Sequence, residues 1–171
     1  MAFSVRILPR QHLDIILYAS DVTRENFDEV WRTLLESKDF DFTFDEIAVF
    51  APDADLANLN FESVNEEARR FKTTHEGAKV ERSRRTAIVV SNQVQVLGAR
   101  MFLAFIATNP PPNVEFKLFN KVNAAIAWIE DGRASSGALR RIDKAEVERT
   151  LAELEHARRL ASGEASRAEA S

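Results

Sequence analysis

Arg100 is the one charged residue in a nearly apolar segment that runs from Val94 to Ile106. A guanidinium group on an apolar helix needs a carboxylate, an anionic ligand or water to accept its hydrogen bonds. Arg100 could therefore form a structural ion pair, recognise the acidic head group of a ligand, or extend into solvent. Gly98, two residues earlier, lowers helix stability by about 1 kcal/mol relative to alanine. It indicates that another element, with a neighbouring helix as the first candidate, approaches the backbone closely.

Ser63 is the second candidate for chemistry, as a phosphorylation site at the start of a helix. A phosphate there would add about two negative charges where the helix dipole and free amides stabilise them. The spacing from Ser63 to Glu66 also matches a capping box, in which the two side chains cap the helix start reciprocally. The capping box explains both residues without a phosphoswitch.

The other reactive residue types form no recognisable catalytic or metal-binding pattern. His12, His75 and His156 are far apart and lack His-x-x-x-His spacing, so the sequence predicts no metal site and no cofactor. Cysteine is absent, and there is no Gly-x-Ser-x-Gly elbow or glycine-rich phosphate loop. An enzyme would need carboxylates and arginines that only the fold brings together, and nothing positive in the sequence supports one.

Composition predicts a soluble globular protein. The 171 residues are 45% apolar and 29% charged, which is enough for one domain with its own core. The formal charge of -4 argues against a nucleic-acid-binding domain. The first residues do not resemble a signal peptide, and no segment reaches the ~18 apolar residues of a membrane-spanning helix. We therefore expect a cytoplasmic protein, with which the lack of cysteine is consistent.

Hydrophobic periodicity predicts strands that alternate with amphipathic helices. Such alternation indicates crossover connections between parallel strands, and the tight link at Pro9-Arg10-Gln11 adds an antiparallel pair at the start. We expect an α/β fold with an open, mixed, mostly parallel sheet of about five strands, helices packed on it, and a C-terminal helix. The expected order is strands at 3–8 and 12–19, a helix at 23–35, a strand at 44–51, a helix at 63–75, a strand at 86–90, a helix at 93–108, a strand at 114–119 and a helix from 122 that ends near Gly132.

Composition changes after the last of these helices and suggests the domain organisation. We expect the α/β domain at 1–131, a linker at 132–142, a C-terminal helix at 143–161 and a disordered tail at 162–171. The C-terminal helix has only a thin apolar seam. It could dock on its own domain, pair with a second subunit or stay solvated.

Charge is unevenly distributed along the chain. Acidic residues dominate between Glu36 and Glu62, and basic residues dominate between Arg69 and Arg85. Such regions could steer self-association or guide an acidic partner to the basic segment, or they could form an ordinary solvated surface.

The order of elements resembles that of the STAS and SpoIIAA-like proteins, which are small α/β domains. The strand Arg85-Thr86-Ala87-Ile88-Val89-Val90-Ser91 and the helix with Leu97-Gly98-Ala99-Arg100-Met101-Phe102 are similar to those of many bacterial members, and the likeness covers roughly Leu13 to Ile129. Better-known members bind protein partners, as anti-sigma-factor antagonists or regulatory domains of anion transporters. The resemblance implies a non-catalytic regulatory module. The family's phosphorylated serine lies in an Asp-Ser-Ser-Gly-like turn, which this chain lacks, and Ser63 is the nearest positional counterpart.

Two functions follow from the helix at 93–108, which has more apolar surface than one sheet face can cover. The first is an interaction module that forms a homodimer or binds a regulatory protein through this helix. The second is a pocket beside the helix that binds a small apolar or amphipathic ligand, with some of the twelve phenylalanines in its wall and Arg100 at an acidic head group. The candidate residues for either role are Gly98, Arg100, Met101, Phe102 and Phe105.

Overall fold

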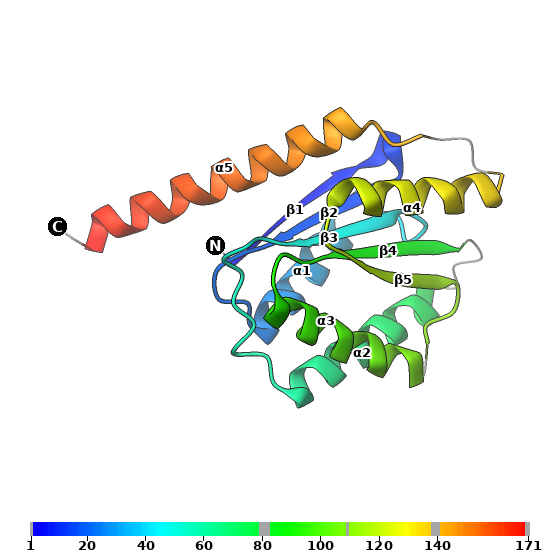
Figure 1. Cartoon of the computed structure of the whole chain (residues 1–171), viewed down its shortest axis with the longest axis horizontal. Coiled ribbons are helices and arrows are strands. Elements are labelled where there is room, and N and C mark those ends of the chain that lie inside the picture. Colours follow the sequence, from blue (N-terminus) through cyan, green and yellow to red (C-terminus); the bar gives the residue numbers. More distant parts are fainter. Residues whose placement is uncertain (1, 79–82, 109, 138–140, 170–171) are drawn as a thin grey trace.

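A mixed five-stranded sheet with helices on both faces forms the body of the protein (Figure 1). The computed structural model describes residues 2–78, 83–108, 110–137 and 141–169. The expected α/β class and the expected order of strands and helices are confirmed. The elements are β1 (Phe3–Leu8), β2 (Leu13–Tyr18), α1 (Arg24–Glu36), β3 (Asp45–Phe50), α2 (Phe61–Ala78), β4 (Arg84–Val89), α3 (Gln93–Thr108), β5 (Val114–Phe119), α4 (Val122–Ser135) and α5 (Lys144–Glu169).

The strands lie side by side in the order in which they occur in the chain, from β1 to β5. β1 is antiparallel to β2, to which a 3-10 turn at Pro9–Gln11 joins it, and all later pairs are parallel. The register aligns Asp14 of β2 with Glu46 of β3, and Glu46 with Thr86 of β4. Registered neighbours point to the same face of a sheet. These three residues, which we call the polar row, therefore share one face.

The helices α1, α2 and α3 connect the parallel strands and cover one face of the sheet, whereas α4 and α5 cover the other (Figure 1). Crossovers between neighbouring parallel strands have the same hand, so helices that connect strands in sequential order collect on one face. We call this the connecting-helix face. The opposite one is the C-terminal-helix face.

Each face of the sheet has its own hydrophobic core. On the C-terminal-helix face the core is largely aliphatic and includes Leu13 and Ile15 of β2 packed with Ile126 and Ile129 of α4. On the connecting-helix face it is rich in aromatic rings, which contact one another edge-on or stacked.

The first half of α5 docks on the chain's own sheet. Ile142, Val147 and Leu154 are buried in the core of the C-terminal-helix face, and α5 contacts β1 and β2. Docking on its own domain, one of the three arrangements that the sequence left open, is observed for this half of the helix. α5 extends through Glu169 and thus includes most of the segment predicted to be disordered, while residues 170 and 171 lie outside the described part.

The predicted linker at 132–142 begins inside a helix, because α4 continues past Gly132 to Ser135. Arg133 in its last turn is 3% exposed. Its Nε donates to Asp45 Oδ2 at 2.7 Å, and its Nη2 donates to the carbonyl oxygen of His12 at 2.8 Å. This buried ion pair anchors the last turn of α4 to the sheet. Most residues of this segment are small or polar, so the sequence analysis did not predict the buried ion pair.

The start of α2 differs from the predicted capping box. The helix begins at Phe61, the Asn60 side chain accepts from the Ser63 amide at 2.9 Å, and Ser63 Oγ accepts from the Asn60 amide at 2.9 Å. The box therefore pairs Asn60 with Ser63, and Glu66 forms an ion pair with Arg24 at 2.6 Å instead. Asparagine is as strong an N-cap as serine. Phosphorylation of Ser63, whose hydroxyl is buried in this cap, stays a prediction.

Candidate ligand-binding site

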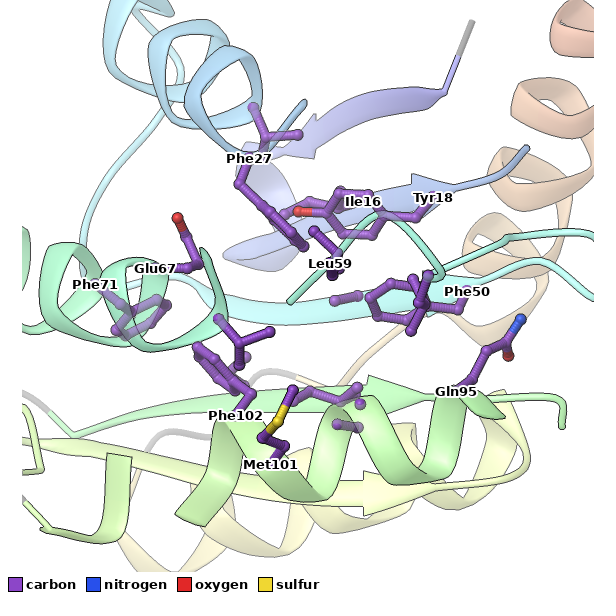
Figure 2. A pocket seen from close by; sticks show the side chains of 18 of the residues that line it. Ile16, Tyr18, Phe27, Phe50, Leu59, Glu67, Phe71, Gln95, Met101 and Phe102 are labelled. Carbon is purple, nitrogen blue, oxygen red and sulfur yellow. The ribbon is translucent and has the colours of Figure 1, made fainter. Parts of the chain in front are cut away.

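A cavity of about 270 Å³ lies between the sheet and the helices of the connecting-helix face (Figure 2). Its walls are mainly aliphatic and aromatic side chains from α1, α2 and α3 and from β2 to β5. Figure 2 shows Phe27 of α1 on one side and Met101 and Phe102 of α3 on the other. An apolar cavity of ~150 Å³ can hold benzene, and small-molecule sites typically measure ~300–1,000 Å³. The cavity is therefore large enough for a small organic molecule.

Small residues in the middle of the walls create this space. Ala48 of β3 is in register with Ile16 of β2 and Ile88 of β4, and all three line the cavity. On α3, Gly98 and Ala99 line it as well. Larger side chains at these positions would occupy the volume, so the cavity is a property of the sequence and not of one rotamer.

The polar row forms one end of the cavity floor. Asp14, Glu46 and Thr86 are 0%, 5% and 3% exposed, respectively. Glu46 and Thr86 line the cavity, and Asp14 lies beside Glu46 on the neighbouring strand. Glu67 adds a second carboxyl group to the lining from α2. An otherwise apolar cavity thus has a polar end.

Arg84 neutralises one of these carboxylates. It is fully buried, and its Nη2 donates to Glu46 Oε2 at 2.5 Å. Its Nε and Nη1 have no hydrogen-bond partner among the described residues. Burial of two charges costs several kcal/mol per ion, which the attraction offsets only when the geometry is good and the remaining donors are satisfied. An incompletely satisfied buried pair is therefore weak evidence of a stabilising role.

Burial raises the pKa values of the carboxyl groups. It raises the pKa of Asp14 to about 8, against the opposing charge of Arg84. It raises the pKa of Glu67 to about 7, although Trp31 Nε1 donates to Glu67 Oε1 at 2.9 Å and so favours the charged form. The pKa of Glu46 is also raised by burial, which Arg84 partly counteracts. At neutral pH Asp14 is mainly protonated, and Glu67 is near the midpoint of its titration.

Several buried polar atoms near the polar row have no hydrogen-bond partner among the described residues. They include both carboxyl oxygens of Asp14, Oγ1 of Thr86 and Nε2 of His75. Leaving a buried polar atom unpaired costs about 1–3 kcal/mol. Thr86 lines the cavity, so a ligand with a hydrogen-bonding group could satisfy its hydroxyl. Apolar walls with a few convergent polar groups are the usual composition of a small-molecule site.

Gln95 lies at the opposite side of the cavity from Glu67 (Figure 2). It is fully buried, and its Nε2 donates to the carbonyl oxygens of Ala51 at 2.8 Å and Ala54 at 3.1 Å. Its Oε1 accepts from the Ser91 amide at 2.7 Å. Gln95 therefore ties the start of α3 to the loop after β3 and holds the cavity wall.

Replacing Gln95 by methionine should lower the free energy of unfolding by about 2–3 kcal/mol, since two carbonyl groups and one amide would lose their partner. Urea unfolding followed by circular dichroism measures the change. Gln93→Met is the matched control, because Gln93 lies exposed on the same turn and should change stability by less than about 0.5 kcal/mol. Equal stability of the two variants would contradict the anchoring role of Gln95.

Three of the residues predicted to bind a ligand or partner line the cavity, namely Gly98, Met101 and Phe102. A Cβ atom on Gly98 would lie 3.0 Å from Leu56 Cδ1. The close approach expected at Gly98 is therefore made by the loop after β3 and not by a neighbouring helix. Phe105 contacts Phe61, with ring centroids 4.6 Å apart.

Arg100 is exposed and does not line the cavity. Of the three environments expected for its guanidinium, water is the one in which the structure places it. α3 also exposes 63% of Val94 and 71% of Leu97, both of which line the cavity. These two side chains therefore lie where the cavity meets solvent.

The acidic and basic regions of the sequence are partly joined inside the protein. Glu46 from the acidic region and Arg84 from the basic region form the buried pair described above, and Asp45 is buried against Arg133. Arg85 pairs with Glu115 at 3.0 Å. The basic residues named here thus have acidic partners within the protein, whereas Lys79 and Arg82 lie outside the described residues.

The sequence analysis did not identify the polar row as a site. Asp14 and Glu46 each lie two residues before a core residue of the same strand, Ile16 and Ala48 respectively. Residues two positions apart in a strand point to the same face, so these polar side chains also face the core. A polar residue at an inward-facing strand position was the available signal. The three residues of the polar row become neighbours only through the register between strands. That register cannot be deduced from the sequence of any single strand.

Comparison of the chain with models of protein families, with curated proteins and with solved structures finds no match. The resemblance to STAS and SpoIIAA-like proteins therefore stays a prediction from sequence. Within the described residues, no helix combines the length and hydropathy needed to cross a bilayer. The same residues contain no group of three or more histidine or acidic side chains placed to hold a metal ion.

Proposed function

We propose that the protein binds a small, mainly apolar molecule in the cavity between the sheet and α1, α2 and α3. The observation that carries this proposal is a cavity of about 270 Å³ with mainly apolar walls and a polar end lined by Glu46, Glu67 and Thr86. A core built only for stability would close such a volume, because cavities cost stability in proportion to their size. Binding of an apolar molecule would recover that cost.

Ala48→Leu tests the proposal, because three added carbon atoms would occupy the middle of the cavity. We expect affinity for the apolar fluorescent probe N-phenyl-1-naphthylamine to fall at least tenfold, while the free energy of unfolding stays within about 1.5 kcal/mol of the wild-type value. Fluorescence titration measures the first quantity, and urea unfolding measures the second.

Ala104→Leu is the matched control, since Ala104 is exposed on α3 and the substitution is chemically the same. It should bind the probe as the wild type does. Wild-type protein that fails to bind the probe, or Ala48→Leu protein that binds it normally, would contradict the proposal. Native mass spectrometry before and after denaturation adds a second readout, the mass of any molecule retained from the cell.

The interaction-module function stays a prediction. Met101 and Phe102, which were expected to contact a partner, are half-buried in the wall of the cavity. The large apolar residues that α3 exposes are Val94 and Leu97. A partner that binds α3 in a homodimer or a regulatory complex would therefore contact Val94 and Leu97, at the mouth of the cavity. The subunit count from the same native mass spectra tests whether a homodimer forms.

A further inference from the structure

We propose that the ligand carries a hydrogen-bond-donating cationic end, such as a primary ammonium group, which lies at the polar row, and that a fatty-acid-like carboxylate is disfavoured. This inference rests on the proposed function of the cavity and specifies the chemical class of the ligand.

The charged groups that line the cavity are all acidic. Among the described residues in its wall, the side chains that ionise are Glu46, Glu67 and the phenol of Tyr18, and no lysine, arginine or histidine lines it. Burial raises the pKa of the Tyr18 phenol, and the nearby charges of Glu67 and Glu46 raise it further. An anionic head group would be repelled by Glu46 and by the ionised form of Glu67, whereas a cation would be attracted by both.

Buried carboxyl groups outnumber buried cationic groups near the polar row. Asp14, Glu46 and Glu67 supply three carboxyl groups against the single buried guanidinium of Arg84. Arg70 also contacts Glu67 Oε2 at 3.4 Å, but its side chain is 30% exposed and does not line the cavity. A buried excess of carboxyl groups either binds protons or binds another cation. A ligand ammonium group would supply that cation.

Hydrogen-bond acceptors are also available at this end. Thr86 lines the cavity, and its Oγ1, which is inaccessible to solvent, has no partner among the described residues. Glu46 uses Oε2 for Arg84, and no hydrogen bond to its Oε1 is found in the described part. An ammonium group has three donors and no acceptor. Its donors match the lone pairs of the Thr86 hydroxyl and the carboxylate oxygens of Glu46 and Glu67, whereas a carboxylate ligand would face carboxylate oxygens that cannot donate to it.

Ligands with the same alkyl chain and different head groups test this inference. We would measure displacement of N-phenyl-1-naphthylamine from the full chain at pH 7 by n-octylamine, 1-octanol and octanoate. We expect octylamine to displace the probe at a concentration at least tenfold lower than octanoate, with octanol between them.

Two variants locate the effect. Glu67→Gln should remove the advantage of octylamine over octanol and leave octanol unchanged, whereas the matched control Glu66→Gln should behave as the wild type, because Glu66 pairs with Arg24 outside the cavity. Thr86→Val should weaken octylamine binding three- to tenfold, and it supplies a second variant if Glu67→Gln does not fold.

Octanoate that binds as tightly as octylamine, or an unchanged octylamine preference in both Glu67→Gln and Thr86→Val, would overturn the inference. In either case octanol and the probe would still bind, so the proposed function would stand. Failure of the probe and all three ligands to bind would instead contradict the proposed function itself.

Discussion

Arg84→Met is expected to lower the free energy of unfolding by about 3–5 kcal/mol, because it leaves the Glu46 carboxylate buried without its guanidinium partner. Both side chains are nearly inaccessible to solvent, and the ion pair between them is the main compensation for their burial. Methionine retains much of the length and apolar contact of the arginine stem, so the loss reports the charge and not the packing. Urea unfolding at pH 7 measures it.

A double variant separates the two contributions. If the cost of Arg84→Met comes from the unpaired carboxylate, then Arg84→Met combined with Glu46→Met should recover most of the lost stability. Arg100→Met is the control, because Arg100 is exposed and should change stability by less than about 0.5 kcal/mol. A double variant that is less stable than Arg84→Met would contradict this account.

The free energy of unfolding should fall by about 3–4 kcal/mol between pH 5 and pH 8 because of Asp14 alone. Burial raises the pKa of Asp14 from 3.8 to about 8. Between these two values the folded protein keeps the proton and the unfolded chain releases it. Unfolding therefore becomes more favourable as pH rises through this window, which is the opposite of the behaviour of a salt-bridged carboxylate.

Asp14→Asn should remove most of this pH dependence, since the amide resembles the protonated carboxyl group in shape and cannot ionise. We expect the variant to be more stable than the wild type at pH 8 and close to it at pH 5, by urea unfolding across the range. Asp131→Asn, at an exposed position of α4, should leave the wild-type slope unchanged. An Asp14→Asn variant with the same pH slope as the wild type would contradict a raised pKa at Asp14.

The elements of this fold could be predicted because each has a local signal. The stripe of Phe27, Val30, Trp31 and Leu34 defines α1, and its cap at Thr23 is found as expected, with the Thr23 amide donating to Asn26 Oδ1 at 2.8 Å. The strand at Val114–Phe119 was predicted with its observed bounds. Hydrophobic period and capping residues act within a few positions of the chain, so one sequence is enough to locate them.

The site could be predicted only in part, because its polar residues belong to strands that are far apart in the sequence. The apolar helix indicated a pocket, and Gly98, Met101 and Phe102 line it. The strand register that places Asp14, Glu46 and Thr86 in one row depends on tertiary packing. Arg100 attracted attention as a charge in an apolar run, yet its helical position faces solvent, and the buried Arg84 lay in a segment that looked like basic surface.

The separation of the two cores has a consequence for how this protein can change. The aliphatic core beneath α4 and α5 packs on the sheet without lining the cavity. It can therefore stabilise the fold and offset the stability that the cavity costs on the opposite face. Substitutions around the cavity can then alter its shape and chemistry while the scaffold survives, and distant sites of this kind tend to act additively. The fold is thus suited to diversification of what it accepts, in natural evolution and in laboratory selection.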